Sequence, residues 1–352
     1  MAKQKKLSKS QSRRIKANQN KRIAKAKKQE PVDEQLDDSL LGTQTFGQVI
    51  TRYGQHADVE NPDGEIVKCN IRRIVNTLVC GDKVIWRPYK KSDSDFAGVI
   101  EAVEPRTSEF VRPDFYDGLK PVAANIDQIL IVSALLPDLT PSIIDRYLIA
   151  VEQLGITPVV LINKMDLLDD DNRELVESTI ELYRDIGYKV LPLSATEEQG
   201  IDAVKELLAD KTSVFVGQSG VGKSSLVNTI VPELNILTKQ VSDNSRLGQH
   251  TTTASRLYRI ENNASIIDSP GVREFAMWHL DDEEIFDGFI EFKPYHGMCK
   301  FRDCQHKNDP SCALKQAIVD GKVTDQRYQS YLKILQANSE ITLRHNSKNR
   351  EI

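Results

Sequence analysis

The sequence predicts a multidomain α/β protein, and three observations lead to that prediction. A first region holds short β patterns separated by turn residues, which are typical of a small barrel. In a second region apolar strands alternate with helices, as in a mainly parallel sheet covered on both faces. A Cys/His cluster and a polar helical end follow. In this 352-residue chain we expect an arm (1–37), a barrel (38–112), an α/β domain (113–285) and a C-terminal module (286–352).

The arm is strongly basic. Residues 1–29 carry twelve Lys or Arg and no acidic side chain, whereas the remaining residues carry 35 basic against 51 acidic side chains. A basic arm on an acidic body predicts contact with nucleic acid, the alternative being a solvated tail without a partner. Residues 1–37 also lack aromatic residues and any apolar period, so we expect them to be disordered when free.

Barrel strands are expected over 45–53, 65–69, 82–86 and 98–103, with a turn at Asn61-Pro-Asp-Gly64. Their spacing predicts a small antiparallel barrel of the oligonucleotide-binding (OB) type. In the α/β region, strands are expected over 128–133, 158–162, 189–193, 213–216 and 265–267. Helices are expected over 142–154 and 172–186.

A phosphate-binding loop follows the strand at 213–216. Gly217-Gln-Ser-Gly-Val-Gly-Lys-Ser224 matches G-x-x-x-x-G-K-[ST], and a helical pattern begins near Lys223. Strand and helix on either side argue against a chance glycine-rich turn. Backbone N–H groups would surround the phosphates, Lys223 would reach the β- and γ-phosphates, and Ser224 would bind Mg²⁺. The expected contacts are Gly217, Gln218, Ser219, Gly220, Val221, Gly222, Lys223, Ser224 and Ser225.

The base is selected by a second motif, Asn163-Lys-Met-Asp166, which follows the strand ending at Ile162. The Asp166 carboxylate would accept hydrogen bonds from guanine N1 and the exocyclic amine, a donor pair that adenine lacks. Asn163 would brace the loop and Lys164 would lie along the base. Ser194-Ala195, after another strand, resembles the short loop that completes a guanine pocket.

Two further segments fit a nucleotide switch. Asp268-Ser-Pro-Gly271 resembles a D-x-x-G element, in which Asp268 would hold Mg²⁺ through water and the Gly271 N–H would sense the γ-phosphate. One threonine of Thr251–Thr253 would complete the Mg²⁺ shell, and we favour Thr253. Together the motifs predict a GTP-hydrolysing enzyme that binds GTP, GDP and Mg²⁺.

The order of the motifs is circularly permuted. The guanine motifs at 163–166 and 194–195 precede the phosphate loop, whereas in familiar small GTPases they follow it. Permutation preserves a site when the original chain ends were adjacent in space.

Activation of the attacking water is the least defined step. Many GTPases place Gln directly after D-x-x-G, but here that residue is Val272, whose side chain cannot hydrogen-bond. His250 is the internal candidate for a catalytic role, because an imidazole can orient water near neutral pH. The alternative is that His250 packs the switch or contacts a partner.

Cysteine usage predicts a structural zinc site. Cys299, Cys304 and Cys312 lie within fourteen residues together with His306, a Cys₃His set suited to closed tetrahedral Zn²⁺. His296 is a competing imidazole. Basic side chains around the cluster could meet phosphates: Lys293, Lys300, Arg302 and Lys307. Cys69 and Cys80 are expected to be ordinary core residues.

The five cysteines therefore indicate metal binding rather than disulfides, and a reducing cytoplasm. No apolar run is long enough to span a bilayer, and the N-terminus is not a secretory signal. We expect no membrane partner. A monomer is expected because no coiled-coil pattern appears.

The chain resembles the RsgA (YjeQ) family of GTPases that depend on the small ribosomal subunit. The resemblance rests on the permuted order, Gly248-Gln-His-Thr-Thr-Thr253, a barrel ahead of the GTPase and a Cys/His module after it. It implies a bacterial cytoplasmic factor that binds the small (30S) subunit and its rRNA during late maturation, with slow GTP hydrolysis stimulated by the subunit. It also favours His306 as the zinc ligand. Gln249 departs from the family, where Arg is frequent.

Two classes of function remain open from the sequence. The first is an RNA-coupled switch that binds the small subunit and leaves after hydrolysis. The second is a GTP-dependent metallochaperone or protein-partner switch, against which the basic arm and the barrel argue. The guanine motif and the threonine switch argue against a phosphate-loop kinase.

Overall fold

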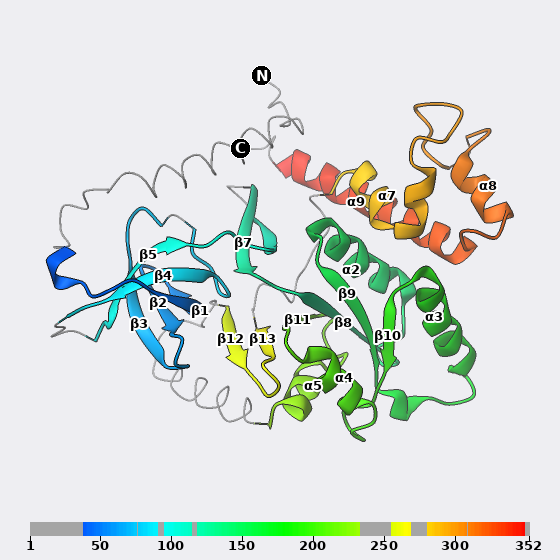
Figure 1. The fold of residues 1–352 in the computed structure, drawn as a ribbon. Helices are drawn as coiled ribbons and strands as arrows, with labels where there is room; N and C mark the ends of the chain where they lie inside the picture. Colours follow the sequence, from blue (N-terminus) through cyan, green and yellow to red (C-terminus); the bar gives the residue numbers. More distant parts are fainter. Residues whose placement is uncertain are drawn as a thin grey trace.

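The computed structural model describes residues 38–75, 77–90, 95–114, 118–232, 255–268, 280–307 and 309–348 (Figure 1). The basic arm, and with it the predicted nucleic-acid contact and disorder of residues 1–37, lies outside this part of the chain. No helix among the described residues combines the length and apolarity that crossing a membrane requires.

The first region is a five-stranded barrel, preceded by the short 3₁₀ helix η1 (Asp38–Leu40). Its strands are β1 (Thr45–Tyr53), β2 (His56–Glu60), β3 (Ile66–Ile71), β4 (Lys83–Pro88) and β5 (Gly98–Val103). The strand β1 pairs with both β2 and β4 and so closes the barrel. The predicted barrel is confirmed, except that β3 pairs with β5 in parallel, so the barrel is not wholly antiparallel. Alternate side chains fill its interior, among them Val49, Val59, Val84 and Ile100.

The second region contains the predicted parallel sheet, in the order β10-β9-β8-β11-β13. These strands are β8 (Gln128–Ala134), β9 (Thr157–Asn163), β10 (Lys189–Pro192), β11 (Thr212–Val216) and β13 (Ser265–Asp268). One face packs against α2 (Pro141–Leu154) and α3 (Arg173–Ile186), and the other against α4 (Ile201–Leu208) and α5 (Lys223–Ile230). A 3₁₀ turn, η2 (Met165–Leu167), follows β9. Burial on both faces explains why the strands are almost wholly apolar.

Barrel and parallel sheet form one continuous sheet of eleven strands, joined through a short strand that the sequence analysis missed. This strand, β12 (Arg256–Arg259), is antiparallel to β13 on one side and to β1 on the other. In Figure 1 β12 and β13 lie between the barrel and the rest of the parallel sheet. A separate hairpin, β6 (Glu109–Asp114) with β7 (Gly118–Ala124), spans the boundary expected after residue 112.

The C-terminal module packs on α2, above the parallel sheet in Figure 1. It comprises α7 (Asp282–Gly288), the 3₁₀ helix η4 (Ile290–Tyr295), α8 (Ala313–Val319) and the long α9 (Asp325–Lys348). A reciprocal capping box between Asp281 and Glu284 begins α7. Ile149 and Ala150 of α2 are buried in the aromatic core of this module, so α2 serves two cores at once.

A buried cluster of charges fixes the module to α2. The guanidinium of Arg327, in α9, is 1% exposed and forms ion pairs with Asp145 of α2 and Glu291 of η4. The Tyr183 hydroxyl donates a 2.5 Å hydrogen bond to Asp145, and the ring of Phe289 lies 4.3 Å from the guanidinium carbon. Burial opposes the charge on Arg327, but the two carboxylates raise its pKa, so it stays ionised.

Replacing Arg327 with Met should destabilise the protein by about 3–5 kcal/mol, because Asp145 and Glu291 would lose their compensating charge inside the protein. The shift can be measured as the midpoint of urea unfolding followed by circular dichroism.

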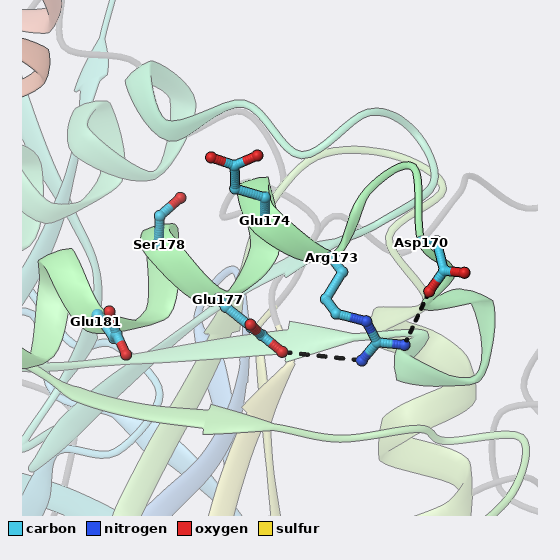
Figure 2. A pocket seen from close by; sticks show the side chains of 6 residues that line it. All are labelled: Asp170, Arg173, Glu174, Glu177, Ser178 and Glu181. Carbon is cyan, nitrogen blue, oxygen red and sulfur yellow. Dashed lines mark ion pairs between the residues drawn. The ribbon is translucent and has the colours of Figure 1, made fainter.

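Arg173→Met is the matched control. Arg173 bridges Asp170 and Glu177 on the surface of α3, where it is 49% exposed (Figure 2). A surface pair of this kind contributes little, so a change within about 0.5 kcal/mol is expected. Equal midpoint shifts for the two variants would contradict the assigned role of Arg327.

Candidate functional site

The predicted phosphate loop connects β11 to α5, and its glycines are required by close contacts. Gly217 has φ 142°, and a Cβ there would lie 2.2 Å from the carbonyl oxygen of Val132 on the neighbouring β8. Gly222 has φ 91°, and its Cβ would lie 2.4 Å from Nδ2 of Asn163. Only glycine adopts such backbone angles while allowing so close an approach.

Inside this loop the ammonium of Lys223 is held by backbone carbonyls. It donates to Gly217 O at 2.8 Å and to Gln218 O. Val221 is buried and anchors the loop, whereas Gln218, Ser219, Gly220, Ser224 and Ser225 are exposed. The N-terminus of a helix that carries a lysine is a setting suited to phosphate oxygens.

The side-chain amide of Asn163 joins three loops. Its Nδ2 donates to the Val221 carbonyl of the phosphate loop at 2.9 Å, and its Oδ1 accepts from the Ala195 N–H at 3.1 Å. Asn163 is 2% exposed, so both hydrogen bonds are shielded from water. The structure therefore brings together the motifs at 163–166, 194–195 and 217–224, which are distant in sequence.

Asp166 and Lys164 lie at the rim of this assembly. The Ser194 hydroxyl, itself buried, donates to Asp166 Oδ1 at 2.5 Å and leaves the rest of this exposed carboxylate accessible to a base. Lys164 has φ 65° and donates to Leu136 O at 2.6 Å and to Gly220 O at 2.7 Å. No local sequence pattern signals that the Ser194 hydroxyl orients Asp166, or that the loop after β8 contributes Leu136, and neither contact was predicted.

Asp268 ends β13 next to the phosphate loop's own strand. Because β13 and β11 are parallel neighbours, with Ile267 opposite Val214, the ends of both strands meet at one edge of the sheet. Asp268 is exposed there, as a carboxylate that holds Mg²⁺ through water would need to be. The other predicted switch residues lie outside the described residues: Gln249, His250, Thr253, Gly271 and Val272.

The four predicted zinc ligands converge. The donor atoms of Cys299, Cys304, His306 and Cys312 all lie within 4.8 Å of one another. Nδ1 of His306 is 3.4 Å from Cys312 Sγ, 3.6 Å from Cys299 Sγ and 3.7 Å from Cys304 Sγ. Zn–S and Zn–N bonds of about 2.0–2.3 Å at tetrahedral angles require donor separations close to these. Three thiolates and an imidazole thus fit one zinc ion.

His306, rather than His296, is the imidazole in this group. Its ring stacks on Phe286 at 4.9 Å, and its carbonyl accepts a hydrogen bond of 2.6 Å from the Tyr328 hydroxyl. His296 instead contacts Asp287 at 2.7 Å and Glu283 at 3.3 Å, and the hydrogen bond to Asp287 raises its pKa.

Cys69 and Cys80 are buried core residues, as expected. Burial raises the pKa of Cys69 to about 12, so its thiol stays protonated.

Comparison with known proteins gives a consistent picture. A profile described as RsgA GTPase matches residues 103–278. A Proteus mirabilis (strain HI4320) protein named small ribosomal subunit biogenesis GTPase RsgA is 51% identical over 345 residues, 97% of each chain. The crystal structure of YjeQ from Thermotoga maritima is 30% identical, with TM-score 0.69, over 84% of this chain and 99% of that chain. YloQ, described as a circularly permuted GTPase, is 29% identical, with TM-score 0.67, over 85% and 96%.

Asn163→Ala should weaken binding of GDP about 10- to 100-fold, because it leaves the Val221 carbonyl and the Ala195 N–H without their buried partner. Isothermal titration calorimetry measures the change. Asn172→Ala is the control, since the Asn172 side chain bonds within its own loop, to Leu167 O and Asp169 N. An Asn163→Ala variant that binds GDP like the wild type would exclude the proposed bridging role.

Cys304→Ser should abolish stoichiometric zinc binding, since a closed tetrahedral site loses one of its four ligands. Metal content measured by plasma mass spectrometry should fall from about one zinc per chain to a small fraction. Cys69→Ser, a substitution in the barrel core, should leave the zinc content unchanged. Full zinc retention in Cys304→Ser would rule out this ligand set.

Proposed function

The chain belongs to the RsgA GTPase family, and from that premise we propose that it binds the small ribosomal subunit and couples GTP hydrolysis to late subunit maturation and to its own release. The observation that carries the proposal is the 51% identity, over 97% of both chains, to a protein named for small-subunit biogenesis. The structural relatives support it, since one of them is described as a circularly permuted GTPase.

The nucleotide would lie across the three loops that Asn163 joins. Asp166 would accept the guanine donors, and Lys164, braced by two carbonyls, would lie along the base. The N-terminus of α5 and Lys223 would balance the phosphate charge. When bound, Mg²⁺ would neutralise charge on the β- and γ-phosphates, with Ser224 and Thr253 as direct protein ligands and Asp268 holding it through water.

Water activation is assigned to His250, because the Val272 side chain cannot hydrogen-bond where many GTPases have Gln. In this reading intrinsic hydrolysis is slow, and the subunit accelerates it by ordering the switch around the nucleotide. The N–H of Gly271 would contact the γ-phosphate, so Gly271 would lose this contact when the γ-phosphate is hydrolysed.

The barrel and the C-terminal module would face ribosomal RNA. Support comes from the OB-type topology and from exposed basic side chains near the zinc ligands, including Lys300 and Lys307. A closed Cys₃His site has no spare protein ligand for transfer, which favours this function over that of a metallochaperone. We place the protein in the cytoplasm as a monomer, in keeping with a factor that binds and leaves the subunit.

GTP turnover by the purified protein should rise strongly with small ribosomal subunits and remain near its basal rate with large subunits. Phosphate release under multiple-turnover conditions measures both. Lys223→Ala is the control for contaminating hydrolases and should show little turnover in any mixture, because it removes the ammonium from the phosphate loop. Equal rates with both subunits would reject the ribosomal part of the proposal while leaving the GTPase assignment intact.

A further inference from the structure

Among the described residues, β1 of the barrel pairs with β12 of the GTPase sheet at one position, Thr51 opposite Arg256. We call the contact of β1 and β2 with β12 the β1–β12 junction; it comprises Thr51, Gln48, Glu60, Ser255, Arg256 and Arg259. Thr51 is 1% exposed and pairs with Arg256, and its hydroxyl donates to the Ser255 carbonyl at 2.9 Å. Ser255 stands only two positions after Thr253 in the sequence.

One line of residues runs across three strands at this point. Thr51 of β1 is opposite Arg256 of β12, and Arg256 is opposite Asp268 of β13. Arg256 therefore lies between Thr51 of the barrel and Asp268, whose carboxylate is expected to hold Mg²⁺. Since neighbouring strands lie about 5 Å apart, a shift of the barrel at Thr51 would be transmitted through this backbone ladder to Arg256 and Asp268.

The other end of β12 is also tied to the barrel. Nε of Arg259 donates to Glu60 of β2 at 2.8 Å, and the same guanidinium donates to Gln48 of β1 at 2.6 Å. A further bond of 2.8 Å reaches Ser265 of β13. β12 is therefore attached to the barrel at both ends, and Thr51 contacts its start through Ser255.

We propose that Thr51 is a positioning residue for GTP hydrolysis: its hydroxyl fixes the Ser255 carbonyl and so sets the start of β12, the strand that pairs with Asp268 and closely follows Thr253 in the sequence. The barrel, through this bond, acts on the rate of the chemical step rather than on nucleotide affinity. The inference deepens the proposed function, because it supplies a route from a barrel-bound partner to the nucleotide, but it concerns turnover of the protein alone.

The test is steady-state GTP turnover without ribosomes. Thr51→Val keeps the shape of the side chain and removes the hydroxyl, so kcat should fall about 2- to 10-fold, the loss expected for one buried hydrogen bond. The KM for GTP should stay within about twofold of the wild-type value, because the guanine and phosphate loops that bind GTP are unaltered. Thr51→Ser retains the donor and should restore most of kcat.

Thr179→Val is the matched control. Thr179 is buried in α3 and its hydroxyl donates to a backbone carbonyl, that of Leu175, at 2.6 Å. Thr179→Val therefore removes a comparable buried hydrogen bond without changing the β1–β12 junction, so kcat should not change. If Thr51→Val does not fold, Arg259→Gln tests the junction from its exposed side and should also lower kcat.

Wild-type kcat in a folded Thr51→Val variant would overturn the inference. An equal loss in Thr179→Val, or no recovery in Thr51→Ser, would do so as well, since either result would point to a general effect on stability. Wild-type protein that small subunits fail to stimulate would instead reject the proposed function and leave this test unaffected.

Discussion

The hydrogen bonds of one buried amide hold the candidate site together. Asn163, at the end of β9, bonds the loop after β11 and the loop after β10, and these three strands end at the same edge of the sheet. Parallel strands make this possible, because all their carboxyl ends share one edge whatever their order along the chain. Circular permutation therefore changes the order in which the loops are synthesised, but not which loops lie together at this edge.

The regions on either side attach to this sheet by different physical means. The barrel shares a backbone ladder with it through β12, whereas the C-terminal module is held by aromatic packing and the buried Arg327 guanidinium. A backbone ladder transmits position from one strand to the next. A buried ion pair enforces a single docking arrangement, because displacement would leave a charge without compensation. α2, which packs on the sheet and in the core of the module, is the shared support.

Local patterns predicted much of the fold and of the site. The phosphate loop, the guanine motif and the Cys/His cluster are short segments whose spacing itself reflects the geometry they adopt. Features that depend on distant partners were missed. The four residues of β12 carry no strand pattern of their own and become a strand because β1 and β13 border them. The pairing of Arg327 with Asp145 spans 182 positions, and the sequence signals neither partner. Identifying His306, rather than His296, as the fourth zinc ligand required either the fold or the family resemblance.

The β1–β12 pairing also bears on how the chain folds during synthesis. β4 pairs with only Thr45 to Gln48 along one edge of β1, and the next strand partner on that edge, Arg256 opposite Thr51, lies 153 residues after the end of the last barrel strand at Val103. At ribosomal speeds of about 5–20 residues per second, that edge stays unpaired for roughly 8–30 s after the last barrel strand has been made. An open strand edge can pair with other chains. The nascent barrel is thus a folding unit that is complete in its core but open at one edge until the GTPase sheet has been made.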